Sequence, residues 1–130
     1  MREILFRGER VDNGEWVYGS LLKQAGEYIS KDEVTPNECW ICGMRGEKAL
    51  IVSETIGQYT GLKDLHGTRI FEKDIVRIYY PFDDPDGCVV SWSKEGARWD
   101  FGGCDAYFCT PSKNCEVIGN VYDDVNLLET

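Results

Sequence analysis

Apolar residues are arranged along the chain in short runs, and most runs are closed by glycine, asparagine, aspartate or proline. Inside the runs, β-branched and aromatic residues either alternate with polar ones or form brief unbroken stretches, and both patterns are typical of β-strands. Strands are predicted over residues 3–10, 15–22, 27–30, 48–55, 69–71, 75–80, 88–93, 97–101 and 115–122. One turn of helix is expected over 123–128, after an aspartate cap. The pattern therefore predicts an all-β fold.

Turn-forming residues connect the predicted strands. Asn13-Gly14 lies between the first two strands, where this dipeptide favours a type I′ hairpin turn with positive φ at both residues. Residues 94–96 join the strands over 88–93 and 97–101 into a second hairpin. The remaining connections are expected to be turns, loops or irregular segments: 31–46, 58–67, 81–87 and 102–114.

The predicted strand over 48–55 contains the unbroken apolar run ALIV, which indicates burial on both faces. The N-terminal part of the chain offers little else to cover the second face. Another copy of the chain is a natural cover, either by packing of sheets or by exchange of strands at an edge. We therefore expect a homo-oligomer in which Ile51 is buried.

Four segments of the chain carry a resemblance to a known family. The segment TIGQYTGLKDLHGTRIFEKDIVRIY has turn residues at fixed offsets followed by a strand, and it is accompanied by REILFRGER, DNGEWVYG and EVIGNVYDDVNLLE. In these segments the chain resembles the YopX family of phage-encoded proteins.

The resemblance implies two β parts. Residues 1–56 would form an N-terminal hairpin-based subdomain that mediates self-association, and residues 57–130 an SH3-like small barrel that ends in a strand and a short helical turn. The resemblance also implies a phage or prophage origin, and it brings no established activity. Lys73 stands where the family usually has glycine in a charged turn. A turn of a different type is therefore expected there, because lysine disfavours positive φ.

The charge of the chain limits its partners. The chain has 130 residues, of which 42% are hydrophobic, and its 23 acidic against 14 basic residues give a net charge of −9. Binding to duplex DNA is not expected, because this charge repels a phosphate backbone and no run of Lys or Arg offsets it. The acidity serves solubility or, alternatively, an acidic surface that meets a basic partner or imitates DNA. With no export signal or membrane-spanning run recognised, we expect the bacterial cytoplasm and no membrane partner.

Six cysteines are the first candidates for a metal site. Cys39 and Cys42 form a CxxC pair, which in a small β protein is half of a zinc site. Cys104 and Cys109 are the next candidates, but their spacing matches no common zinc module. We therefore treat these four as weak zinc candidates, and we expect reduced thiols packed in a β protein with no metal and no cofactor.

Catalytic groups are not assembled by any recognised motif. Asp83, Asp84 and Asp86 resemble the start of a calcium loop, but Glu95 is one position away from where an EF-hand places its last ligand, and flanking helices are missing. A solvated acidic loop is the simpler interpretation. His66 is the only histidine, and no Ser or Cys is placed by a motif to act with it. No enzymatic activity is expected.

Five residues are the candidates for an interaction surface. Gln58, Tyr59 and Thr60 belong to the most family-like stretch, where a structural role for their side chains in a turn is favoured over a partner contact. Trp92 and Trp99 lie on the second hairpin, where their rings would stack on bases if single strands bind. The sequence thus predicts a non-catalytic, self-associating interaction or assembly module for a phage or host protein. The alternative is a nucleic-acid-associated accessory protein that binds through the small-barrel face.

Overall fold

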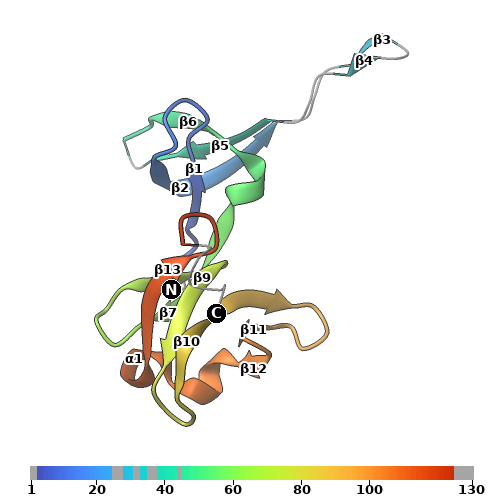
Figure 1. Cartoon of the computed structure of the whole chain (residues 1–130). Coiled ribbons are helices and arrows are strands. Elements are labelled where there is room, and N and C mark those ends of the chain that lie inside the picture. The colour runs from blue at the N-terminus through green and yellow to red at the C-terminus, as the bar shows by residue number, and fades with distance from the viewer. Residues whose placement is uncertain (1–2, 25–27, 31–32, 35–37, 44, 125–130) are drawn as a thin grey trace. The chain divides into compact units, whose positions relative to one another are not determined.

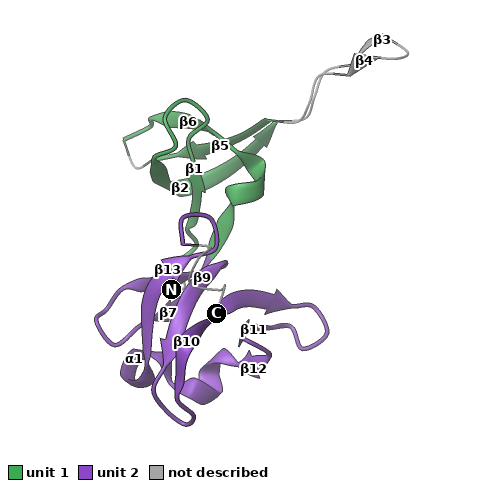
Figure 2. Ribbon diagram, viewed as in Figure 1, with its two compact units in different colours: residues 1, 3–58 green, residues 2, 59–130 purple. Residues whose placement is uncertain are grey.

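The computed structural model describes residues 3–24, 28–30, 33–34, 38–43 and 45–124 (Figure 1). The chain is all-β, as predicted, and divides into two compact units. Unit 1 ends at Gln58 and unit 2 begins at Tyr59 (Figure 2), whereas the sequence placed this boundary after Ile56. None of the helices in the described ranges is long and apolar enough to cross a membrane.

Unit 1 is built around an antiparallel sheet with the order β6-β5-β2-β1-β7, to which β7 contributes its first two residues, and β3 and β4 form a separate two-stranded sheet. Its elements are β1 (Phe6–Glu9), β2 (Trp16–Gln24), β3 (Tyr28–Ser30), β4 (Glu33–Val34), β5 (Glu38–Cys42), β6 (Lys48–Ile51), the 3₁₀ turn η1 (Ser53–Thr55) and the start of β7 (Gly57–Lys63).

The first predicted hairpin is confirmed, but its turn differs from the prediction. β1 and β2 pair antiparallel with Glu9 opposite Trp16. Only Gly14 in the connection has positive φ (72°), so the turn is not type I′. Instead, the Asn13 side chain accepts a hydrogen bond from the Glu15 N–H at 2.9 Å, which is local turn chemistry that asparagine supplies well.

The predicted loop over 31–46 contains strand β5, so this prediction was wrong. β5 lies between β2 and β6 and hydrogen-bonds to both. Cys39 and Ile41 point into the core of unit 1 and are 8% and 2% exposed, while Trp40 and Cys42 on the other face are only half-buried. Because both faces carry apolar residues, the period-two pattern of this strand is difficult to recognise in the sequence.

The predicted strand over 48–55 is shorter than expected and is not buried on both faces. β6 ends at Ile51, its only buried residue, and η1 follows. At this point Leu50 accepts a hydrogen bond from the Val11 N–H at 2.9 Å, and the Val52 N–H donates to the Glu9 carbonyl at 2.9 Å. Backbone groups at the end of β1 and just after it therefore form hydrogen bonds with the free edge of β6. β6 therefore does not require a second chain to cover it.

A close approach of backbone and side chain explains one glycine of unit 1. A Cβ atom at Gly8 would collide with Cγ2 of Ile51. Gly8 is buried in β1, and Ile51 bridges to Arg10 near the end of the same strand. A side chain at position 8 would separate β1 from β6, so glycine is required by packing there.

Unit 2 contains a five-stranded antiparallel sheet with the order β12-β11-β10-β9-β13, together with the pair β7–β8. Its elements are the remainder of β7, β8 (Arg69–Phe71), β9 (Asp74–Ile78), β10 (Asp84–Ser93), β11 (Arg98–Phe101), β12 (Cys104–Asp105), the 3₁₀ helix η2 (Ala106–Cys109), the short helix α1 (Pro111–Asn114) and β13 (Cys115–Asn120). No sheet is closed within the described ranges.

The core of unit 2 surrounds β9, where Ile75, Val76 and Ile78 are completely covered. One cluster of buried side chains joins the strands to η2. Its members are Ile70, Val76, Ile78, Val90, Trp99, Phe101, Ala106, Cys109 and Cys115. Burial of these large apolar groups is the main stabilising contribution to the unit.

Three predicted connections of unit 2 contain strand residues: 58–67, 81–87 and 102–114, the last of which contains β12. Residues 57–63 form β7 rather than turns, and the buried Thr60 hydroxyl donates to the Ile70 carbonyl at 2.7 Å. β10 begins at Asp84, inside the predicted acidic loop over 81–87. The polar residues of 58–67 and 81–87 are of types that are common in turns, although the backbone of these segments forms hydrogen bonds with neighbouring strands.

The other strand predictions of unit 2 are confirmed with shifted ends. β8 matches its predicted range, the second hairpin pairs Ser93 with Arg98, and β13 stops two residues earlier than predicted. The expected helical turn over 123–128 lies mostly outside the described residues, as does Glu27 at the start of the third predicted strand.

Lys73 adopts the left-handed conformation that glycine favours, with φ of 72°. The expectation of a different turn at this position was therefore wrong. The Lys73 N–H donates to Val90 at 2.8 Å and its carbonyl accepts from Val121 at 3.0 Å, so two neighbouring segments hold the residue in place. The Asp74 carboxylate closes the same turn by accepting the Phe71 N–H at 2.7 Å.

Candidate functional site

Two adjoining hollows in unit 2 share Gly61 and Tyr107, and we call them together the aromatic hollow. The first has a volume of about 260 Å³ and the second about 390 Å³. The second lies within the range of about 300–1,000 Å³ that is typical of small-molecule sites, and the first lies just below that range. The lining residues are Tyr59, Thr60, Gly61, Leu62, Lys63, Trp92, Ala97, Arg98, Trp99, Tyr107, Thr110, Pro111 and Ser112.

A pair of tryptophans forms one wall of the aromatic hollow. Trp92 on β10 lies opposite Trp99 on β11, and the rings meet edge to face with centroids 5.1 Å apart. Trp99 belongs to the core and is 6% exposed, whereas Trp92 is 45% exposed. The buried ring therefore fixes the exposed one in a defined orientation. The buried Nε1 of Trp99 has no acceptor among the described residues.

Strand β7 contributes the adjoining surface. Tyr59 is 5% exposed and packs on Phe71, with ring centroids 5.6 Å apart. The Arg69 guanidinium lies 5.8 Å from the centroid of the Tyr59 ring. Thr60 is held by its bond to Ile70 and also accepts the Leu62 N–H at 3.1 Å. These contacts make this side of the hollow a rigid surface.

The opposite side comes from the η2–α1 segment. Tyr107 is 69% exposed, and its N–H donates to the Asp105 carboxylate at 2.9 Å, which caps η2. Thr110 follows in the left-handed conformation with φ of 47° and redirects the chain into α1. The Tyr107 ring is therefore presented to solvent beside both parts of the hollow.

The charge of the aromatic hollow differs from that of the chain. No carboxylate lines either part, although the chain carries 23 acidic residues. Lys63 and Arg98 are the lining cations. Arg98 Nε lies 2.8 Å from the Asp100 carboxylate, and this hydrogen bond raises the pKa of Arg98 above its ordinary value. The surface is thus aromatic and cationic in an acidic protein.

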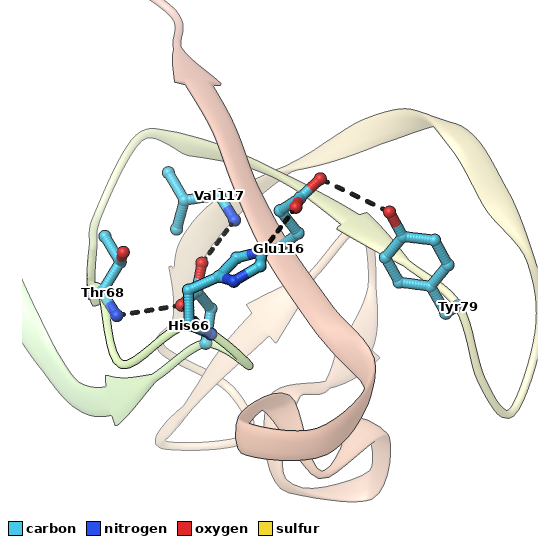
Figure 3. Close-up of polar contacts among 6 residues, drawn as sticks. His66, Thr68, Tyr79, Glu116 and Val117 are labelled. Carbon is cyan, nitrogen blue, oxygen red and sulfur yellow. Dashed lines mark hydrogen bonds and ion pairs between the residues drawn. The ribbon is translucent and has the colours of Figure 1, made fainter.

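A separate polar cluster surrounds the turn between β7 and β8 (Figure 3). The buried Asp64 carboxylate accepts N–H groups from His66, Thr68 and Val117, each at 2.9 Å. The Leu65 N–H donates to the Cys115 carbonyl at 3.0 Å. Asp64 and its neighbour therefore take the place of a strand partner along the start of β13.

The same cluster contains a pair of side chains that resembles an acid–base arrangement. His66 Nε2 lies 2.8 Å from Glu116 Oε2, and the Tyr79 hydroxyl donates to Glu116 Oε1 at 3.4 Å (Figure 3). Hydrolytic chemistry of this type also needs a nucleophile within hydrogen-bond reach of the imidazole. In the part of the chain that the structure describes, no Ser, Thr or Cys side chain bonds to His66.

Nearly the whole chain matches a known protein family. The family model described as YopX protein matches residues 5–129. The chain belongs to the YopX family. The resemblance inferred from the sequence is thereby confirmed over nearly the whole length of this YopX-family protein. No curated protein matches it.

Among solved structures, the YopX-family chain is similar to the crystal structure of protein EF1440 from Enterococcus faecalis. The two are 19% identical, the match covers 98% of this chain and 99% of the other, and the TM-score is 0.57. At this identity the likeness shows a shared fold.

The structure brings four of the five predicted interaction residues together. Tyr59, Thr60, Trp92 and Trp99 all line the aromatic hollow. Gln58 does not line it; it lies opposite Phe6 in unit 1. The four come from strands separated in sequence, and this juxtaposition was not part of the prediction.

The sequence missed the other residues that shape the hollow, notably Lys63, Arg98 and Tyr107. Tyr107 lies in the segment over 102–114 that was interpreted as irregular. The available signal was Asp105 placed two residues before Tyr107, which is a capping pattern for a short turn.

The weak zinc candidates do not form a chelating arrangement. Cys39 and Cys42 lie three positions apart on β5, and residues at that spacing in a strand face opposite sides of the sheet. Cys104 and Cys109 belong to unit 2, where burial raises the pKa of the Cys109 thiol. The described residues contain no group of three or more Cys, His, Asp or Glu side chains suited to a metal ion.

The aspartates of the predicted acidic loop have separate surroundings. Asp84 is the first residue of β10, opposite Ile78. Asp83 forms an exposed ion pair with Arg77 at 3.1 Å. Asp86 is exposed within β10. A strand at this point is incompatible with the looped backbone that a calcium site of the EF-hand type requires.

Proposed function

We propose that this YopX-family protein is a non-catalytic interaction module and that the aromatic hollow is its binding surface. The observation that carries the proposal is a concave surface of aromatic side chains, with two cations and no lining carboxylate, in a chain of net charge −9. Exposed aromatic rings gathered in a concavity are typical of recognition sites. A phage or prophage origin, which rests on the family resemblance, and a cytoplasmic location are part of the proposal.

The strand arrangement supports describing unit 2 as an open relative of a small SH3-like barrel, which we include in the proposal. β9 to β12 form a meander, and β13 returns to pair with β9. A last strand that pairs with the first strand of a meander is the arrangement from which a small barrel is made. The aromatic hollow lies beside the β10–β11 hairpin of this meander.

A non-catalytic role is supported by the state of two of the six cysteine thiols. Burial raises the pKa of the Cys88 and Cys115 thiols to about 12, so both are protonated near neutral pH. Neither therefore offers a thiolate for attack. The His66–Glu116 pair is exposed and holds the β7–β8 turn against β13, which is a structural contact.

Protein-observed NMR with small aromatic and heteroaromatic compounds tests the binding surface. The chain has four tryptophans, and their indole N–H signals divide between the units. We expect the Trp92 and Trp99 signals to shift on titration, while Trp16 and Trp40 in unit 1 serve as internal controls. Equal shifts of all four signals, or none, would count against the aromatic hollow.

Two tyrosines provide a matched pair of variants. Tyr107 lines the hollow and is 69% exposed, whereas Tyr80 is 67% exposed and does not line it. Tyr107→Ala should weaken the binding of the same compounds, and Tyr80→Ala should leave it unchanged. The proposal is abandoned if both variants bind as the unmodified protein does.

A further inference from the structure

We propose that the occupant of the aromatic hollow is a short single strand of nucleic acid; this inference rests on the proposed function of the hollow as a binding surface. Each base ring of such a strand has two flat apolar faces, and a phosphate joins each nucleotide to the next. An occupant of that chemistry needs aromatic faces to stack on and cations without competing carboxylates.

The aromatic hollow offers aromatic faces together with Lys63, a lining cation that is not paired with a carboxylate among the described residues. Trp92 and Tyr107 are exposed and flank the first part, whose volume of about 260 Å³ admits a base with room for its sugar. Tyr107 also borders the second part, of about 390 Å³, together with Lys63. Stacking on such rings is tolerant of sequence, because every base has a flat face.

Charge complementarity distinguishes this surface from the rest of the protein. Lys63 and Arg98 line the hollow, Arg98 in an ion pair with Asp100 at 2.8 Å, and Arg69 lies close by over the ring of Tyr59. A peptide rich in Lys or Arg would find no lining carboxylate to bind there. A polyanion is repelled by a chain of net charge −9 except where such a surface exists, so the contact is confined to a few nucleotides.

Single strands are favoured over a duplex because the aromatic rings of the hollow would bind the flat faces of the bases. In a duplex the base faces are stacked on one another and cannot reach Trp92 or Tyr107. A duplex would present mainly phosphates, which the acidic chain repels.

Trp99 lines the hollow with its ring, while its Nε1 is buried. It has no acceptor among the described residues, and an unsatisfied buried N–H is unfavourable. Because the Trp99 ring packs edge to face on Trp92, a base that stacks on Trp92 would change the surroundings of this N–H. The Trp99 indole signal is therefore a sensitive reporter of occupancy.

Fluorescence anisotropy with labelled oligothymidylate and oligouridylate of about ten nucleotides tests the inference. At low salt, about 50 mM, we expect saturable binding of one or both single strands and at least tenfold weaker binding of a duplex of the same length. A preference for oligouridylate over oligodeoxyuridylate would identify RNA, because these two strands differ only in the 2′-hydroxyl.

Two pairs of variants locate the contact. Trp92→Ala should weaken binding roughly 5- to 150-fold, the loss typical of one stacked base, while Tyr80→Ala should not change it. Lys63→Ala should lower the slope of log affinity against log salt by about 0.7, the value for one phosphate contact in a single strand. Lys94→Ala removes an exposed lysine of the β10–β11 turn that does not line the hollow and is the control. Circular dichroism and the Trp99 signal verify that each variant is folded.

The outcomes separate this inference from the proposed function. Absence of single-strand binding up to about 100 µM, binding equal to that of the duplex, or binding unaffected by Trp92→Ala overturns the inference. If small aromatic compounds occupy the hollow and oligonucleotides do not, the binding surface stands and the inference fails; if a proline-rich peptide also binds there, the ligand is a protein segment. If neither occupies it, both proposals fail.

Discussion

The Asp64 carboxylate accepts three backbone N–H groups from two segments of unit 2, and replacing it with Ala should strongly destabilise that unit. Two of the three, from His66 and Thr68, form the β7–β8 turn, and the third, from Val117, belongs to β13, 53 positions away along the chain. Asp64 is only 3% exposed, so water cannot easily replace it. The variant would leave three partly buried donors without an acceptor.

The expected magnitude follows from these donors. Leaving a buried donor without an acceptor costs about 1–3 kcal/mol. Because water reaches some of the partly buried donors in the variant, we expect a total loss of about 3–6 kcal/mol in the free energy of unfolding. That is a large fraction of the ~5–15 kcal/mol typical of a domain. Asp64→Asn should cost about half as much, since its amide keeps one oxygen and turns an NH₂ group toward a donor.

Urea denaturation followed by tryptophan fluorescence measures this loss, and amide hydrogen exchange at Val117 locates it. The matched control is Asp105→Ala. Asp105 also accepts an N–H two residues ahead, from Tyr107 at 2.9 Å, but that bond is exposed. We expect the control to cost about 0.5–1 kcal/mol, the net value of an exposed hydrogen bond. Equal losses for Asp64→Ala and Asp105→Ala would refute the idea that Asp64 joins the two segments.

Three further predictions concern the backbone, the thiols and assembly. Lys73→Gly should raise the free energy of unfolding by about 0.5–1 kcal/mol, because φ is 72° at this residue and glycine avoids most of the steric cost; a loss of stability in urea would contradict this. Burial raises the pKa of Cys88 and Cys115 from 9.0 to about 12. Iodoacetamide at pH 8 should therefore modify these thiols roughly a thousandfold more slowly in the folded than in the unfolded chain, as measured by mass spectrometry. Equal rates would show that the thiols are accessible. Self-association through unit 1 rests on the family resemblance alone, and light scattering should give a multiple of 14.8 kDa; a mass of 14.8 kDa at all concentrations would exclude it. If an oligomer forms, Ile51→Lys should dissociate or unfold it, because Ile51 is 4% exposed and a charge there would be buried without a partner.

Strand pairing explains which parts of the fold the sequence could predict. The β10–β11 hairpin and β8 are local structures, whose turn residues and β-branched neighbours lie within a few positions of one another. The β5 strand was missed because its identity depends on β2 and β6, which bond to it from both sides. Likewise the edge position of β6 could not be seen in the apolar run ALIV, which has the same pattern in a central strand.

The sequence also predicted one part of the candidate site and missed another. The aromatic type of Trp92 and Trp99 and their place on a hairpin were visible in the sequence, because a short hairpin fixes which residues are opposite each other. Their assembly with Tyr107 and Lys63 was decided by tertiary structure, since η2 and β7 lie outside the hairpin in sequence and contribute to the same hollow only in the folded unit.

By itself, the sequence determined the all-β class, the family, the two hairpins and the acidic charge, because each depends on residue type or on neighbours a few positions apart. Only the tertiary structure decided that Asp64 joins β13 to the β7–β8 turn and that the lining of the aromatic hollow excludes carboxylates. The physical reason is that hydrogen bonds and surfaces between distant segments depend on strand order and register, and short apolar runs are compatible with many orders and registers.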